Sequence, residues 1–288
     1  MIVDRLALVG TGLIGGSFAL ALKQAGAVRE VVGVGRNPAR LTLARELGLI
    51  DRAVDWAEAA QADCILLALP VGETEAVLRQ LAPHLKAGAV VTDAGSTKAN
   101  VVAAARTALG TRVPDFVPGH PIAGSEQSGP AAARADLYRG KRVVLTPEAD
   151  TRADAVARVR ALWEVAGAQV ETLDAAQHDR IFAAVSHLPH LAAYTLVDEL
   201  ARRADGEVFF RFAASGFRDF TRIAGSSPEM WRDIALANRD ALLAELDAYL
   251  AALQTLRAAV DARDGAALHT IFSRARKARE DWIKTQDV

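Results

Sequence analysis

Three histidines of this 288-residue chain stand where a titratable side chain could do chemistry. His120 lies in the segment 119–126, whose glycines and proline restrict the backbone around one imidazole. That setting suits a general base, and we predict that His120 is catalytic. His187 and His190 are three residues apart on one face of a predicted helix, either as a packed pair or as substrate contacts. No further His or Cys has a recognisable ligand spacing, so we expect no metal site.

Ser96 is a second candidate for contact with a substrate. It lies in the segment Asp93–Lys98, which follows a predicted strand and so sits at the carboxyl edge of the sheet, where ligands bind in open α/β folds. Its hydroxyl could contact the substrate or a nicotinamide ring. It could also cap a helix over 97–108, and the two roles are compatible.

Two arginines, Arg218 and Arg222, lie in a stretch that alternates aromatic and charged residues. One of them could form a buried ion pair with Asp219 or Glu126. The other could then bind an anionic substrate through its planar guanidinium group.

A glycine-rich turn predicts a dinucleotide cofactor. The pattern G-x-G-x-x-G at residues 10–15 follows a predicted strand and opens a predicted helix, which is the context that makes this motif informative. Its glycines permit a tight turn, close approach of the backbone to a pyrophosphate, and close helix–strand packing. The predicted cofactor-binding residues are Gly10, Thr11, Gly12, Leu13, Ile14, Gly15, Arg36, Pro70 and Asp93.

The end of the second predicted strand favours NADP over NAD. An acidic residue about 20 positions after the glycine loop would bind the ribose 2′-hydroxyl, but Gly35 and Arg36 stand there. Arg36 could supply the counter-charge of a 2′-phosphate, with help from Arg40. The alternative is that Arg36 is a solvated loop charge.

The elements that must position these residues follow from the hydrophobic pattern. Short apolar runs alternate with helical patterns as far as residue 173, which is typical of a parallel sheet wound by crossover helices. The predicted strands are Leu6–Gly10, Val31–Val34, Cys64–Leu69, Ala89–Thr92, Lys141–Thr146 and Gln169–Leu173. Helical patterns follow at 174–203, 234–260 and 266–284, and Pro189 should kink the first. We predict an α/β N-terminal Rossmann-type dinucleotide-binding domain over 1–172 and an all-α C-terminal substrate and dimerisation domain over 173–288.

The composition excludes several classes of partner. Thirty-four Lys and Arg residues against 35 Asp and Glu leave a net charge of −1, which is too little positive charge for nucleic acid or an anionic bilayer. No apolar run approaches the length of about 18 residues that a membrane span requires. The single cysteine, Cys64, allows no intramolecular disulfide, so we expect a cytoplasmic protein.

A leucine seam predicts a homodimer. Leu243, Leu246, Leu250 and Leu253 have a 3-4-3 spacing that places them along one side of the predicted helix 234–260. The seam could be covered within its own domain. A two-fold partner is the simpler cover, because the helical domain has no sheet against which to bury it.

Five motifs together resemble the prephenate and arogenate dehydrogenases of tyrosine biosynthesis, in their single-function bacterial form. The matching segments are G-T-G-L-I-G-G-S at 10–17, D-A-G-S-T-K at 93–98, G-H-P-I-A-G-S-E at 119–126, V-S-H-L-P-H at 185–190, and G-F-R-D-F-T-R-I-A at 216–224 with S-P-E-M-W-R-D at 227–233. The resemblance implies oxidative decarboxylation of prephenate or arogenate, a cyclohexadienyl acid. Hydride passes to the nicotinamide, His120 accepts the hydroxyl proton, and loss of CO2 makes the ring aromatic without a metal.

The resemblance also implies roles for residues around His120. Ser96 would hydrogen-bond His120 or the substrate hydroxyl, and Arg222 would bind a substrate carboxylate. The remaining substrate-binding residues are His187, His190, Ser125, Glu126 as an ionic gate, and Trp231 beside Arg222. Which of prephenate and arogenate is preferred stays open, as does the choice between NADP and NAD.

Two alternative functions can be weighed against this one. A β-hydroxyacid dehydrogenase would share the domain order but uses a lysine on the first long helix, and the chain has no lysine between Lys141 and Lys277. A non-enzymatic NADP-sensing protein would need the cofactor loop. It would not need His120, His190 and Arg222 together.

Overall fold

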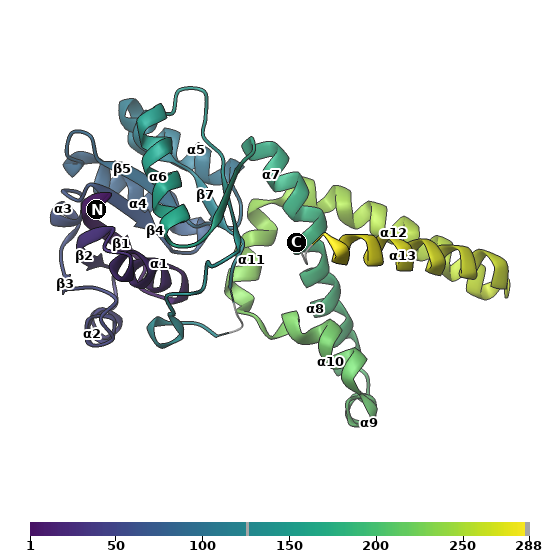
Figure 1. The fold of residues 1–288 in the computed structure, drawn as a ribbon. Helices are drawn as coiled ribbons and strands as arrows, with labels where there is room; N and C mark the ends of the chain where they lie inside the picture. The colour runs from purple at the N-terminus through teal and green to yellow at the C-terminus, as the bar shows by residue number, and fades with distance from the viewer. Residues whose placement is uncertain (125–126, 286–288) are drawn as a thin grey trace. The chain divides into compact units, whose positions relative to one another are not determined.

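A six-stranded parallel sheet with strand order β3-β2-β1-β4-β5-β6 organises the N-terminal part of the chain (Figure 1). The computed structural model describes residues 1–124 and 127–285, and it divides into two units, residues 1–239 and 240–288. The strands are β1 (Val3–Val9), β2 (Val28–Val34), β3 (Arg52–Ala53), β4 (Cys64–Leu67), β5 (Val90–Asp93) and β6 (Phe116–Val117). Their order reverses between β1 and β4, and ligands bind at such a switch point. The predicted dinucleotide-binding fold is confirmed.

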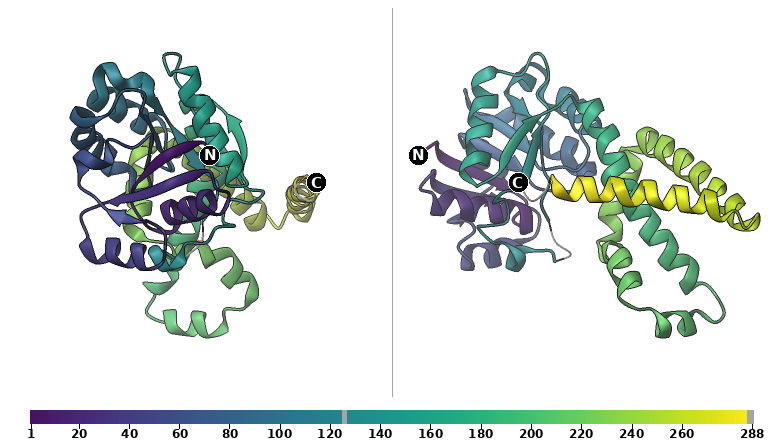
Figure 2. Two further views of the ribbon diagram at one scale, coloured as in Figure 1. Left: turned by 60° about the vertical axis from the view of Figure 1, so that its left-hand side comes forward. Right: turned by 45° about the vertical axis from the view of Figure 1, so that its right-hand side comes forward.

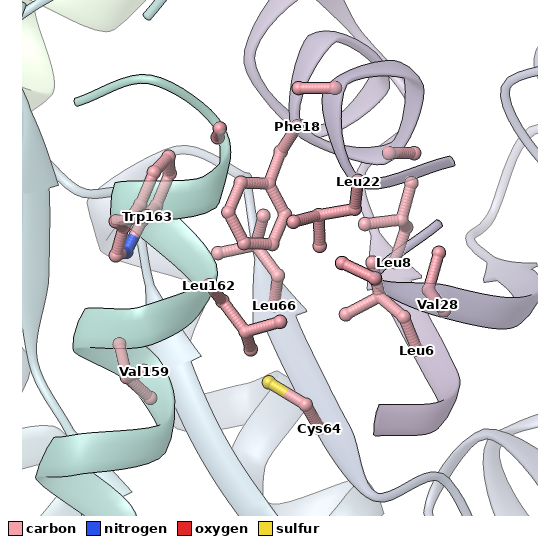
Figure 3. Close-up of a cluster of buried hydrophobic side chains, with 14 of the residues drawn as sticks. Leu6, Leu8, Phe18, Leu22, Val28, Cys64, Leu66, Val159, Leu162 and Trp163 are labelled. Carbon is pink, nitrogen blue, oxygen red and sulfur yellow. The ribbon is translucent and has the colours of Figure 1, made fainter. Parts of the chain in front are cut away.

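Helices cover both faces of this sheet, because each strand buries alternate residues on opposite sides (Figure 2). The helices are α1 (Leu13–Gln24), α2 (Pro38–Glu46), α3 (Trp56–Ala59), α4 (Thr74–Leu81), α5 (Ala99–Leu109) and α6 (Ala153–Val165). On β1, Leu6 and Leu8 pack with α1 and α6, whereas Ala7 and Val9 pack with α4 and α5 on the other face. Figure 3 shows Phe18 of α1 beside Trp163 of α6, with ring centroids 4.2 Å apart.

A second, three-stranded sheet carries His120. Its strands are β7 (Gly119–Pro121), β8 (Arg142–Leu145) and β9 (Gln169–Thr172), with β7 antiparallel to β8 and β8 parallel to β9. The predicted loop around His120 is therefore wrong at its start, because His120 pairs with Val144 in the ladder. Pro121 is compatible with this strand because β7 lies at the edge of the sheet, where a missing N–H can face away from the ladder.

The predicted helix at 174–203 is interrupted by a π-helical turn. α7 (Ala175–Phe182) passes through the turn Ala183–His187 into α8 (Leu188–Ala201), and Figure 1 shows the two helices running on from one another. Pro189 lies in the first turn of α8, where its missing N–H costs little. Single π-helical turns inside helices often mark functional sites, and this one ends at His187.

The predicted helix at 234–260 is two helices. α9 (Gly206–Phe212), α10 (Ser215–Thr221) and α11 (Pro228–Ala237) complete the first unit. Ser227 caps α11, because its Oγ accepts from the N–H of Met230. α11 ends at Asn238, which has left the helical conformation. Asn238 donates its side-chain amide to the carbonyl of Asp179 at 2.8 Å and to Nδ1 of His187 at 3.0 Å. These two bonds explain why the helix ends at this point.

The remaining helices are α12 (Arg239–Asp261) and α13 (Gly265–Lys284). Three leucines of the predicted seam, Leu243, Leu250 and Leu253, have exposed fractions of 42%, 53% and 42%. Among residues 1–124 and 127–285, no helix combines the length and the apolar character that crossing a membrane requires.

Candidate active site

A cleft of about 570 Å³ opens at the carboxyl ends of β1, β2 and β4 and contains the glycine loop. Gly10 has φ +99°, and a Cβ there would lie 2.1 Å from the carbonyl oxygen of Ala68. A Cβ on Gly15 would lie 2.2 Å from the carbonyl oxygen of Gly10. A Cβ on Gly12 would meet nothing within 4 Å, because this residue faces open space.

The start of α1 fits a pyrophosphate. Gly12 is its N-cap, and neither a side-chain cap nor an acidic residue occupies the first turn. The first N–H groups of the helix are therefore available to an anion, which the helix dipole also favours. Thr11 and Pro70 line the same cleft, as predicted for the cofactor site. These observations fit a dinucleotide, whose nicotinamide would supply a hydride acceptor.

Arg36 lies at the far end of this cleft, together with Gly35 and Arg40. Its Nη2 lies 2.6 Å from each carboxylate oxygen of Glu73, although its side chain is 77% exposed. Arg36 is therefore not only a solvated loop charge. It is held across the cleft by an acid that we did not predict.

A second cavity, of about 390 Å³, adjoins the cofactor cleft. Both are lined by Gly12 and Pro70, so the space continues from the glycine loop toward the second sheet. The second cavity also contains Leu13 and Ile14, and it brings together Ser96 and His120, the two residues predicted to be catalytic. A substrate held beside these two side chains would lie next to the cofactor cleft.

His120 is connected through hydrogen bonds to His178 and Asp179, two residues that sequence reasoning missed. Its Nδ1 lies 2.8 Å from Nε2 of His178, and Nδ1 of His178 lies 2.8 Å from a carboxylate oxygen of Asp179. The rings of His120 and Phe182 also meet edge to face. Burial lowers the pKa of His120 well below its usual value, and the nearby His178, Lys98 and His187 lower it further. His120 is therefore neutral near pH 7, as a proton acceptor must be.

A buried ion pair fixes the residue before His120. Lys98 is fully buried, its Nζ pairs with the Asp93 carboxylate, and it donates to the carbonyl of Gly119 at 2.7 Å. The other Asp93 oxygen accepts from the N–H of Gly119 at 3.0 Å. The predicted cofactor contact of Asp93 is not supported, because these partners engage its buried carboxylate and it lines neither cavity. Lys98 was overlooked, although it ends a motif that the sequence analysis quoted.

Asp179 caps α5 in place of Ser96. Its two oxygens accept from the N–H groups of Lys98 at 2.7 Å and Ala99 at 2.9 Å. The alternative role of Ser96 as a helix cap is therefore wrong, since α5 begins at Ala99 and receives its cap from α7. The Ser96 hydroxyl can therefore contact a molecule bound in the second cavity, which Ser96 lines.

The two histidines after the π-helical turn have different surroundings. His190 stacks on Trp231 with ring centroids 3.6 Å apart, and its Nδ1 donates to the carbonyl of Ser186 at 2.9 Å. His187 is 1% exposed, binds Asn238 and does not line either cavity. The predicted substrate contact of His187 is not supported, because its ring packs beneath the site, and burial lowers its pKa to about 4.

Two family models match the chain in succession, the prephenate dehydrogenase nucleotide-binding domain over residues 18–172 and the prephenate dehydrogenase dimerization domain over residues 174–274. The chain belongs to the prephenate dehydrogenase family. A cyclohexadienyl dehydrogenase of Zymomonas mobilis is 36% identical over 282 residues, which cover 96% of each chain. A prephenate dehydrogenase of Bacillus subtilis is 36% identical over 281 residues, which cover 96% of this chain and 76% of that protein.

Solved structures of prephenate dehydrogenase relatives have the same fold. The A. aeolicus prephenate dehydrogenase in complex with hydroxyphenyl propionate and NAD+ has a TM-score of 0.91 and 35% identity, covering 96% of this chain and 98% of that one. The Synechocystis arogenate dehydrogenase has a TM-score of 0.81 and 31% identity, covering 96% and 99%. The family resemblance is confirmed, and the chain is an oxidoreductase with a nicotinamide cofactor and a C-terminal dimerisation domain.

Three further predicted substrate contacts, Arg222, His190 and Trp231, line neither cavity. Arg222 is exposed in the short helical turn Arg222–Gly225, and its charge contributes to a lowered pKa of His190. The predicted contacts at Ser125 and Glu126 lie outside the described residues. A buried pair with Asp219 is not formed, because Arg218 and Asp219 are mostly exposed and 3.9 Å apart. No cluster of three His, Cys, Asp or Glu side chains that could hold a metal occurs in the described part of the chain.

Proposed function

We propose that this chain oxidises and decarboxylates prephenate or arogenate with His120 as the base, giving 4-hydroxyphenylpyruvate or tyrosine. The observation that carries the proposal is the position of His120, a neutral imidazole that lines a cavity continuous with the glycine-loop cleft. The family supplies the class of reaction, and the site supplies a base where that reaction needs one.

Each residue of the site has a part in this proposal. His120 accepts the proton of the substrate hydroxyl, and the Ser96 hydroxyl in the same cavity orients that group. When bound, the nicotinamide accepts the hydride. The backbone of Gly10, Thr11 and Gly12 holds the cofactor's pyrophosphate at the start of α1, and Gly15 lets the helix lie close to the Gly10 carbonyl.

We assign the substrate carboxylate to Arg222, with His190 and Trp231 forming the wall beside it. His190 stacks on Trp231, and the charge of Arg222 adds to burial in lowering the pKa of His190. A planar guanidinium group binds a carboxylate in a bidentate manner. Ser125 and Glu126 stay part of this proposal as further substrate contacts.

We further propose that NADP is preferred to NAD. The support is Arg36 in the cofactor cleft and the absence of an acid at Gly35, where a Cβ would meet nothing within 4 Å. Gly35→Asp combined with Arg36→Ala should shift the ratio of kcat/KM values toward NAD, because it adds a 2′-hydroxyl acceptor and removes a cation. An unchanged ratio would show that the 2′-phosphate is recognised elsewhere.

Assembly and domain organisation are also proposals. We infer a cytoplasmic homodimer joined through the helical domain, because Leu243, Leu250 and Leu253 of α12 are exposed and the matching family model describes a dimerization domain. The domain boundary lies near residue 173, between the segments that the two models match. Light scattering that gives the 30.6 kDa mass of one chain would contradict the dimer.

The reaction is tested by mixing the protein with prephenate or arogenate and with NAD+ or NADP+, and following the absorbance of the reduced nicotinamide. We expect reduction with at least one pair, and His120→Asn should lower kcat by about 10²- to 10⁴-fold with cofactor binding unchanged. The matched control is His84→Gln, at an exposed histidine outside both cavities. No reduction with any of the four pairs would refute the proposed reaction.

A further inference from the structure

We propose that His178 and Asp179 of α7 form a relay behind His120, which fixes its reactive tautomer and takes up the positive charge that it gains from the substrate. The inference rests on the proposed function, because it assigns positioning residues to the base of that reaction. Neither residue is among those that line the two cavities, so each would act through His120 and not by touching the substrate.

The acceptor at the end of the relay sets the direction of its hydrogen bonds. The Asp179 carboxylate accepts only, so His178 carries its proton on Nδ1, 2.8 Å away. Nε2 of His178 is then an acceptor and receives the Nδ1–H of His120, also at 2.8 Å. His120 is left with a lone pair on Nε2, the form that a base requires.

Proton transfer along the relay needs no other reactant. When His120 accepts the hydroxyl proton at Nε2, its Nδ1–H bond can break as an N–H bond forms at Nε2 of His178. His120 is then neutral again, and the positive charge lies on His178 in contact with Asp179. Because an unpaired cation is costly to bury, this transfer stabilises the state that follows proton abstraction.

The other charged groups around the two rings leave Asp179 as the carboxylate that can neutralise this charge. Burial, and after it the charge of Lys98, oppose protonation of both His120 and His178, and His187 opposes it at His120. Asp93 favours protonation of His178, but its carboxylate is already paired with Lys98. Asp179 itself stays ionised, because the N–H groups at the start of α5 and the His178 side chain stabilise its carboxylate and lower its pKa.

The test must separate a relay from the cap that Asp179 provides to α5. Asp179→Asn removes the charge and keeps one oxygen for the cap. His178→Gln keeps a possible acceptor for His120 but cannot hold the transferred proton. Asp174→Asn is the matched control, because Asp174 caps α7 through the N–H of Gln177 at 2.7 Å and stands four residues before His178.

We expect kcat to fall about 10- to 100-fold in both Asp179→Asn and His178→Gln, with the substrate KM changed less than about threefold. The double variant should be no slower than His178→Gln, because residues that act as one unit are not additive. The acid limb of kcat/KM against pH should move to lower pH in Asp179→Asn, since the imidazolium loses its carboxylate partner. Asp174→Asn should behave as the wild type in all three measurements.

Loss of activity that is equal at every pH, or losses that multiply in the double variant, would overturn the relay and leave Asp179 as a helix cap. Nitrogen-15 NMR of the histidines in the resting protein tests the relay without turnover. The relay requires a proton on Nδ1 of His120 and a lower His120 pKa in Asp179→Asn. A proton on Nε2 instead overturns the relay, even in an active enzyme. An inactive wild type overturns the proposed reaction, and the NMR result still decides the relay.

Discussion

Acid should destabilise the fold through His187, a buried histidine that lines neither cavity. Its ring is 1% exposed, its Nδ1 accepts from Asn238, and burial lowers its pKa to about 4 from 6.5. Between these two values the unfolded chain binds a proton that the folded chain does not, so stability is lost as the pH falls through this window. One pKa unit corresponds to about 1.4 kcal/mol, so the full window is worth about 3 kcal/mol and the step from pH 7 to pH 5 about 2 kcal/mol.

Urea unfolding followed by tryptophan fluorescence measures this loss, since Trp231 lies with its ring 6.0 Å from that of His187. We expect the wild type to lose about 2 kcal/mol more than His187→Gln between pH 7 and pH 5. Other buried histidines titrate in both proteins, so the difference isolates His187. His84→Gln, at an exposed site, should lose as much as the wild type. Equal losses in the wild type and His187→Gln would refute the assignment of a low pKa to His187.

Four further substitutions test the ion pair, the cofactor loop and the substrate carboxylate. Lys98→Met should lower the free energy of unfolding, measured with urea, by about 3–5 kcal/mol, because it leaves the buried Asp93 carboxylate without its cation. A decrease of less than about 1 kcal/mol would contradict this. Gly12→Ala should raise the nucleotide KM with little change in melting temperature, whereas Gly10→Ala should melt far lower because its Cβ would strike a carbonyl oxygen. Arg222→Ala should raise the substrate KM by about 10- to 100-fold, as loss of a charge-assisted hydrogen bond predicts, with a smaller change in kcat. Unchanged substrate binding would assign the carboxylate to another cation.

The sheet could be predicted because buried strands and glycine turns are local signals. Each predicted strand overlaps an observed one, but the predicted strands Lys141–Thr146 and Gln169–Leu173 correspond to β8 and β9 of the second sheet and do not extend the six-stranded one. β3 and β6 have two residues each, which is too short for a periodic pattern. The end of α11 could not be predicted, because Asn238 breaks an Ala/Leu-rich pattern only through bonds to residues 51 and 59 positions earlier.

The residues of the candidate site also fall into two classes, those marked by a local sequence signal and those identified only by tertiary contacts. Ser96, His120 and the glycine loop lie in short motifs after strands, and such motifs can be recognised from the sequence alone. His178 and Asp179 are identified by their partners, which lie 58 and 81 positions away.

One local signal could have singled out the pair on α7. His178 and Asp179 are four and three residues before Phe182, so all three share the buried face of the helix. A titratable pair on an apolar face must have polar partners, because burying it alone would cost several kcal/mol. That reasoning predicts a polar partner for the pair but not its identity. His120 becomes the partner only because β7 is paired with β8 and Lys98 ties Gly119 to Asp93 at the end of β5. The reactivity of the base is therefore set by tertiary contacts, which is why the motif could identify His120 but not the groups that tune it.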